Sequence, residues 1–290
     1  MALWTPPRRF TLGRRSVTGA ATITAPGWID PDATKTADLY NTACSAGLGD
    51  DQLVLDFVWS SPQWAQAITV CNHNGSVGAK GRARVWTGDR LLFDTAETAN
   101  AGGAWSYLWP GVPEVPYGDP RWWGFRPNVD DIKGYPGYWP VLLPEIEPFT
   151  RVRLEFSDPV NPLGRLYIGH VAVEPVIQTI RQFDKGATLG WLDAGTLTGA
   201  DQGVPIGALG AAPRTFKATF SRLREHEAFG GFFVNMGEVG LVEPVTLIPD
   251  PGAGATLLHQ TFKATYRTRQ GIEYRGARYA LTVEFTEWRG

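Results

Sequence analysis

The stretch from Phe149 to Glu174 constrains this chain most, because it predicts two β-strands joined by a turn. Charged and apolar side chains alternate over residues 151–156, which is the two-residue period of a half-buried strand. Proline, asparagine and glycine then interrupt the strand over residues 158–164, since these residues favour turns. A second apolar run follows over residues 166–173. We expect this hairpin to close one β-sandwich, with a second domain after it.

Short alternating strands are predicted on both sides of this stretch. They lie at residues 53–59 and 82–86 before it, and at residues 216–220 and 279–285 after it. The chain contains 34 glycines and 22 prolines but only 19% charged residues, a composition that is rare in helical proteins. We therefore predict an all-β protein.

The predicted strands divide into two domains. Residues 1–174 are expected to form an N-terminal β-sandwich of the jelly-roll type, and residues 175–290 a small C-terminal β-sandwich or barrel. The second domain carries one expected α-helix over about residues 222–233, with Ser221 as its N-cap. The side chains that can share the apolar face of this helix are Leu223, Phe229, Phe232 and Phe233.

An aromatic-rich segment interrupts the first domain at about residues 95–148. Its many prolines and glycines fit no strand or helix of ordinary length, so we predict a long, ordered loop. Aromatic side chains supply large, rigid contact areas for a sugar ring or a partner protein. The alternative is that the loop packs on itself and covers an edge of the sheet. The candidate contact residues are Trp105, Trp109, Trp122, Trp123, Tyr138 and Trp139.

The sequence contains no recognisable catalytic motif. It has no nucleophile elbow, no phosphate-binding loop and no H-E-x-x-H zinc motif, and its four histidines lack metal-ligand spacing. Carboxylates in and beside the aromatic segment offer the paired acids that a glycosidase needs, but adjacent loop carboxylates are mostly solvated. These carboxylates belong to Asp130, Asp131, Glu145 and Glu147. We expect no catalytic residue, no metal and no cofactor.

The two cysteines, Cys44 and Cys71, do not make a disulfide framework. They could pair with each other, but buried free thiols are the favoured alternative.

Charge and hydropathy argue against two classes of partner. A net charge of −2 provides no basic excess for a nucleic-acid binder held by phosphate contacts. No apolar run approaches the roughly 20 residues that span a bilayer, and the N-terminus has no apolar core of signal-peptide length. We therefore expect a protein that is made and folded in a cytoplasm, without nucleic-acid specificity or membrane insertion.

Two groups of segments resemble known families. The first domain is similar to galactose-binding-like jelly rolls of the discoidin type in QLVLDF, AITVCNHN, RARVWTGD, RVRLEFSD and RLYIGHVAVE. A longer string resembles minor tail and distal tail (baseplate) proteins of long-tailed bacteriophages: LEFSDPVNPLGRLYIGHVAVEP. The second domain is similar to the same group in GWLDAGTLTGADQG, FKATFSRLREHEAF and VTLIPDPGAG. The domain order differs from the usual distal tail protein, in which the ring domain comes first.

The phage resemblance implies a structural protein of the virion tail that is made in the host bacterial cytoplasm. It implies partners as well: copies of itself in a ring, as a hexamer, and other phage tail proteins that the ring links to the tail tube. The alternative is a carbohydrate-binding module that recognises a host surface glycan without catalysis. A glycan-degrading enzyme using the loop carboxylates is a third hypothesis.

Overall fold

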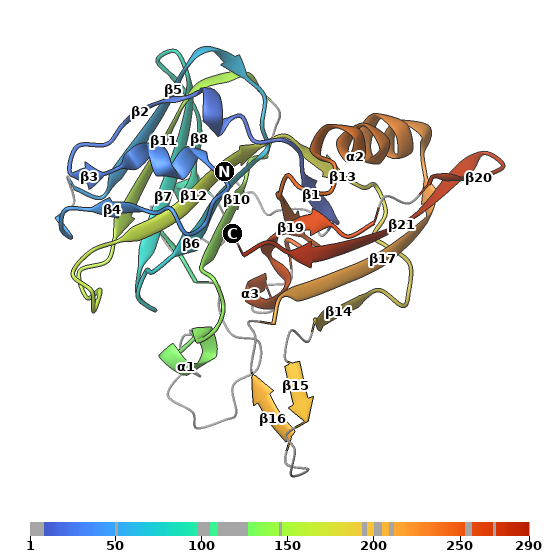
Figure 1. Ribbon diagram of the computed structural model, residues 1–290. Coiled ribbons are helices and arrows are strands. Elements are labelled where there is room, and N and C mark those ends of the chain that lie inside the picture. Colours follow the sequence, from blue (N-terminus) through green and yellow to red (C-terminus); the bar gives the residue numbers. More distant parts are fainter. Residues whose placement is uncertain are drawn as a thin grey trace, which may run out of the picture. The chain divides into compact units, whose positions relative to one another are not determined.

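The computed structural model describes residues 9–49, 52–97, 105–109, 127–144, 147–192, 196–199, 205–208, 212–252, 257–268 and 271–289 (Figure 1). Strands predominate in it, which confirms the all-β prediction. The chain divides into two compact units. Unit 1 extends to Ile180 and includes Val245–Phe262, whereas unit 2 comprises Arg181–Pro244 and Lys263–Arg289.

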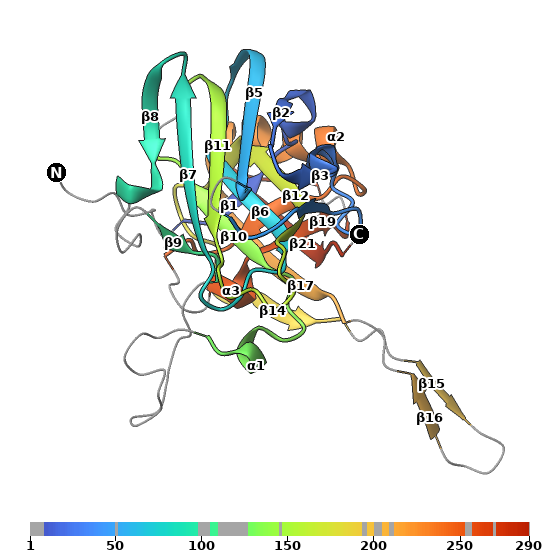
Figure 2. The same cartoon turned by 90° about the vertical axis from the view of Figure 1, so that its left-hand side faces the viewer.

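Unit 1 contains a β-sandwich of two antiparallel sheets, and Figure 2 shows strands of the first sheet side by side. The first sheet has the spatial order β2 (Thr22–Thr24), β5 (Val54–Gln63), β11 (Phe149–Ser157), β7 (Lys80–Thr87) and β8 (Arg90–Asp94), and β9 (Ser106–Tyr107) pairs with β7. The second has the order β10 (Tyr138–Leu142), β6 (Ala67–His73), β12 (Tyr167–Glu174), β4 (Ala43–Ser45) and β3 (Trp28–Ile29).

The core of the sandwich lies between these sheets. Alternate residues of the first sheet, such as Leu55 and Leu154, are fully buried against residues of the second, such as Val70 and Val171. Because successive side chains of a strand point to opposite faces, the alternation in the sequence marks this buried face. Burial of this apolar surface is the main force that holds the two sheets together.

The two strands predicted over residues 149–174 exist, but they do not form a hairpin. Strand β11 pairs with β5 and β7, whereas β12 pairs with β4 and β6 in the opposite sheet. The connection between them is held by Asp158, which accepts hydrogen bonds from the Ser76 backbone N–H (2.8 Å) and from Asn161 Nδ2 (2.8 Å). The turn residues were therefore predicted correctly, but they carry the chain across the sandwich.

Short elements complete unit 1. Strands β13 (Val176–Gln178), β1 (Thr11–Gly13) and β18 (Val245–Ile248) lie side by side in that order. Their pairing explains why this unit extends past the expected boundary at residue 174 and includes a distant segment of the chain. Among its described residues, the helices are the 3₁₀ turns η1 (Thr18–Ala20), η2 (Pro31–Lys35) and η3 (Thr95–Glu97) and the single-turn helices α1 (Val129–Ile132) and α3 (Leu257–Gln260).

Unit 2 contains one antiparallel sheet with a helix. Its strands have the order β19 (Phe262–Tyr266), β21 (Arg278–Glu287), β17 (Arg214–Leu223) and β14 (Thr188–Trp191), and β20 (Glu273–Arg275) also pairs with β21. Strands β15 (Thr196–Gly199) and β16 (Pro205–Ala208) pair with each other as a separate two-stranded sheet.

The helix of unit 2 begins later and extends further than the predicted 222–233. Ser221 is no N-cap: β17 continues through Leu223, and Ser221 Oγ donates a hydrogen bond to Asp184 Oδ1 (2.9 Å). A π-helix, η5 (His226–Phe233), begins beyond it and continues as α2 (Val234–Val239). Residues 220–223 are a strand rather than a helix start because their pairing with β21 continues across a register shift.

Within the described part of the chain, no helix is both long and apolar enough to cross a membrane. Cys44 and Cys71 are both buried and unbonded to each other, in agreement with the favoured alternative.

Candidate functional site

The described part of the aromatic segment contributes buried rings to the first unit. Within residues 95–148, where no regular element was expected, the structure contains η3, β9, α1 and β10. Trp109, Tyr138 and Trp139 are each at most 5% exposed. Trp109 Nε1 donates a hydrogen bond to the Gly75 carbonyl oxygen (2.7 Å), and Trp139 Nε1 donates to Ser106 Oγ (3.1 Å).

Burial therefore removes Trp109, Tyr138 and Trp139 from the predicted contact surface. Their rings are covered by the chain's own residues, which leaves no free face on which a sugar could stack. Trp105 is half-buried, and Trp122 and Trp123 lie outside the described residues. Residues 105–109 and 138–142 instead fit the alternative prediction, in which the segment packs on its own domain. Strand β9 pairs with β7 in the first sheet, and β10 pairs with β6 in the second.

Several titratable side chains of this region are buried or take part in capping and ion-pair contacts within the chain. His73 lies against Trp109, with ring centroids 4.8 Å apart. Burial lowers the pKa of His73 to about 3, so its ring is neutral at pH 7. Asp131 forms a capping box with Asn128 at the start of α1, and Glu147 pairs with Arg90 (2.8 Å). Glu145 lies outside the described residues.

The described side chains do not form a metal centre. No cluster of three or more His, Cys, Asp or Glu side chains that could hold an ion occurs among the residues that the structure describes.

A cluster of four aromatic rings lies on unit 2, and two of them are exposed while the other two are partly buried. We call it the aromatic patch, and it consists of Phe229, Phe233, Tyr274 and Tyr279. Ring centroids of Phe229 lie 6.0 Å from Phe233, 6.1 Å from Tyr274 and 5.1 Å from Tyr279. The side chains of Phe233 and Tyr274 are 59% and 74% exposed. Such rings normally mark a surface that another molecule covers.

Two elements position the aromatic patch. Phe229 and Phe233 come from the π-helix η5, whereas Tyr274 and Tyr279 face each other across the hairpin of β20 and β21 (Figure 1). Phe232 points the other way: it is fully buried, and its ring lies 5.2 Å from that of Phe220. The wide turn of a π-helix brings residues four apart onto one face, and π-helical turns are frequent at functional sites.

Sequence reasoning missed this patch for an identifiable reason. The 3.6-residue period of an α-helix places Phe229, Phe232 and Phe233 on one core-facing side. The Gly230-Gly231 pair was a sign that an ordinary helix was disfavoured there. No pattern in the sequence singled out Tyr274.

Comparisons with known proteins assign no family. No family model matches this chain, and no curated protein matches it. Among solved structures, it is similar to a CBM32 domain from a family 31 glycoside hydrolase of Clostridium perfringens, with 8% identity, a TM-score of 0.35, and coverage of 56% of this chain and 98% of that chain. It is also similar to the family 32 carbohydrate-binding module of Streptococcus pneumoniae EndoD, with 12% identity, a TM-score of 0.31, and coverage of 56% and 99%.

A third similar structure is truncated AlyQ with CBM32 and alginate lyase domains. Its identity is 10% and its TM-score 0.34, and the match covers 85% of this chain and 56% of that one. At these identities and TM-scores, the likenesses assign no function to this chain. The candidate site therefore rests on its own geometry, which offers contact surface rather than reactive groups.

Proposed function

We propose that this protein is a non-catalytic structural protein that assembles with further copies of itself through unit 2. The assembly that its sequence resembles is the ring at the tail tip or baseplate of a long-tailed bacteriophage, where it would link the tail tube to other tail proteins. The observation that carries the proposal is the aromatic patch. Clustered aromatic residues at the centre of an interface commonly supply most of its binding energy.

Two further features of unit 2 support an assembly role. Strand β14 ends the sheet, and its Leu189 and Trp191 side chains are substantially exposed. Monomeric proteins usually protect such apolar edge strands from pairing. Strands β15 and β16 pair with no other strand in the described part of the chain. Because an isolated hairpin is at best marginally stable in water, a neighbouring subunit would stabilise it.

The double variant Phe233→Ser/Tyr274→Ser tests this proposal. Both side chains are exposed, so their loss should leave the fold intact while weakening assembly. Central aromatic anchors each contribute about 2 kcal/mol or more, or roughly 30-fold in the dissociation constant, so the loss of both should raise the subunit dissociation constant by up to about 1,000-fold. Light scattering and sedimentation should show a multi-subunit wild type and a variant shifted toward monomer.

Trp64→Ser, which removes an exposed aromatic side chain from unit 1, is the matched control and should assemble like the wild type. A wild type that stays monomeric at its highest soluble concentration contradicts self-assembly. Equal masses for wild type and double variant show that the aromatic patch is not the interface.

A specific feature of unit 1 favours carbohydrate binding as a second candidate function. Trp64, on the turn between β5 and β6, is 54% exposed. The turn is fixed by a hydrogen bond from the Gln66 backbone N–H to the Glu174 carbonyl oxygen (3.0 Å). An exposed indole on a fixed turn is suited to stack on the face of a sugar ring.

Trp64→Ala is expected to abolish glycan binding if this second function exists. Titration with bacterial envelope polysaccharides should produce a saturable change in tryptophan fluorescence in the wild type. Trp191→Ala, which removes a tryptophan of similar exposure from unit 2, should retain that change. No saturable change in the wild type, or an equal change in Trp64→Ala, excludes a sugar site at this turn.

A further inference from the structure

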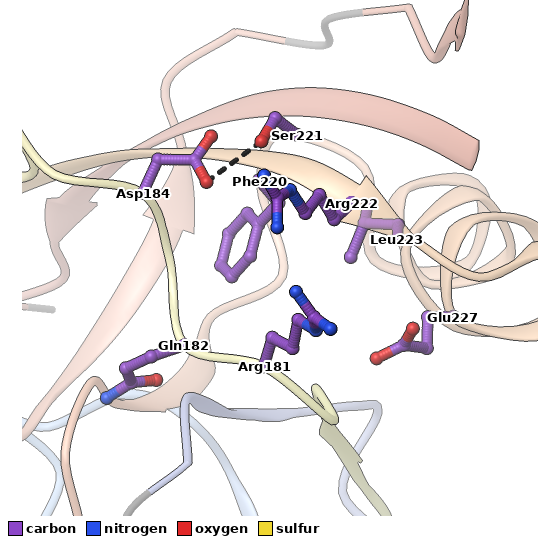
Figure 3. A pocket seen from close by; sticks show the side chains of 8 residues that line it. All are labelled: Arg181, Gln182, Asp184, Phe220, Ser221, Arg222, Leu223 and Glu227. Atoms are coloured by element: carbon purple, nitrogen blue, oxygen red, sulfur yellow. Dashed lines mark hydrogen bonds between the residues drawn. The ribbon is translucent and has the colours of Figure 1, made fainter. Parts of the chain in front are cut away.

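Unit 2 has a pocket with a volume of about 260 Å³ beside strand β17 (Figure 3). One wall is the segment before β14, which contributes Arg181 and Asp184, and the other is the end of β17, which contributes Ser221 and Arg222. The segment is fixed against the strand, because the Asp184 backbone N–H donates to the Thr219 carbonyl oxygen (2.8 Å). The walls are therefore held together by backbone as well as side-chain hydrogen bonds.

An aromatic group supports the pocket from within the unit. Phe220 lines it and is almost fully buried. Its ring centroid lies 6.4 Å from that of Phe183 and 5.2 Å from that of Phe232. These ring contacts hold Phe220 in place where it lines the pocket.

The acidic side chains of the pocket accept hydrogen bonds from within the chain, whereas the side chains of its two arginines donate none within the described residues. Among the acids, Asp184 accepts a hydrogen bond from Ser221 Oγ (2.9 Å), and Glu227 accepts one from the Arg224 backbone N–H (2.8 Å). The guanidinium groups of Arg181 and Arg222 have no ion pair or hydrogen bond within the described residues. Figure 3 shows the two side chains reaching into the pocket from its opposite walls.

The unused hydrogen-bonding capacity of the pocket is therefore mainly that of two arginines. Guanidinium groups prefer carboxylate and phosphate, which they bind through two parallel N–H···O bonds. The two acids leave the pocket without a large positive charge, which disfavours a multiply charged anion. Sites for drug-sized ligands usually measure about 300–1,000 Å³, so this pocket suits a single functional group.

We propose that this pocket binds a carboxylate group through Arg181 and Arg222. The carboxylate could come from a Glu or Asp side chain of a protein partner or from a free small carboxylic acid. The site goes beyond the proposed function, because none of its lining residues belongs to the aromatic patch.

Titration followed by NMR tests the site, with the Nε–Hε signals of the arginines as the readout. Free butyrate, which carries a single carboxylate, a short acetylated and amidated peptide containing one Glu, and the same peptide with Gln are the probes. We expect saturable shifts of the Arg181 and Arg222 signals with the Glu peptide or with butyrate, and none with the Gln peptide. Tighter binding of the peptide identifies a protein partner as the source, and tighter binding of butyrate identifies a small molecule.

The variant Arg181→Gln/Arg222→Gln should weaken this binding tenfold or more. Arg165→Gln removes an exposed arginine of unit 1 and should leave it unchanged. Non-saturable shifts that sodium chloride reproduces, or equal binding by the double variant, overturn the proposal. The same titration on Phe233→Ser/Tyr274→Ser separates the two hypotheses, because carboxylate binding should persist when assembly is lost.

Discussion

Glu287→Gln is expected to lower the free energy of unfolding of unit 2 by about 3–5 kcal/mol, the usual cost of breaking a buried ion pair. The Glu287 side chain is 0% exposed and that of its partner, Arg214, is 2% exposed. Glu287 accepts hydrogen bonds from Arg214 through the guanidinium group (2.5 Å) and the backbone N–H (2.9 Å). The glutamine would leave a buried guanidinium charge without its counter-charge.

Urea denaturation and hydrogen exchange of the β17 and β21 amides measure this effect. The matched control is Glu284→Gln on the same strand, whose partner Arg267 is 49% exposed. Because solvent screens exposed pairs, this control should lose no more than about 1 kcal/mol. Equal losses in the two variants would show that burial does not set the strength of the Arg214–Glu287 pair.

A double replacement separates the cost of breaking the pair from its net contribution. Well-packed apolar residues often replace a buried ion pair at no loss of stability. Arg214→Met/Glu287→Leu should therefore recover much of the stability that Glu287→Gln loses. A double variant as unstable as the single one would show that the ion pair itself is required to hold the beginning of β17 to the end of β21.

The strands were the part of the fold that the sequence could predict. Alternation over residues 151–156, 216–220 and 279–285 marks strands β11, β17 and β21, because each has one face in a core and one face toward solvent. The pairing of strands could not be predicted in this way. Alternation reports which face of a strand is buried, but it carries no information about the neighbouring strand. It is therefore equally compatible with β11 and β12 forming a hairpin and with their lying in two different sheets.

The candidate site was harder to predict, because the number of aromatic residues does not reveal their burial. Trp109 and Trp139 lie in the segment richest in tryptophan, yet both rings are buried. Phe233 and Tyr274 lie outside that segment, and they are exposed because a π-helix and a short hairpin hold them outward. Their exposure depends on backbone geometry that no composition count describes.

Trp139→Ala is expected to lower the free energy of unfolding of unit 1 by about 3–5 kcal/mol, the usual cost of removing a buried tryptophan. The Trp139 ring packs edge-on against Phe156, with centroids 6.1 Å apart. A Cβ atom built on Gly81 would lie only 2.6 Å from the ring, so the ring lies close against the backbone of β7. The substitution would leave a cavity between the two sheets and remove the hydrogen bond to Ser106.

Two further variants serve as controls for the stability change in Trp139→Ala. Trp64→Ala should change the stability by no more than about 0.5 kcal/mol, because an exposed side chain leaves no cavity. Trp139→Phe should fall between the two, since it keeps a ring but removes the hydrogen bond to Ser106. Urea denaturation of all three decides between the two readings of the aromatic segment. If Trp139 is a core residue, the loss in the free energy of unfolding should be smallest for Trp64→Ala, intermediate for Trp139→Phe and largest for Trp139→Ala. If Trp139 were part of a surface platform, Trp139→Ala would change the free energy of unfolding as little as Trp64→Ala does.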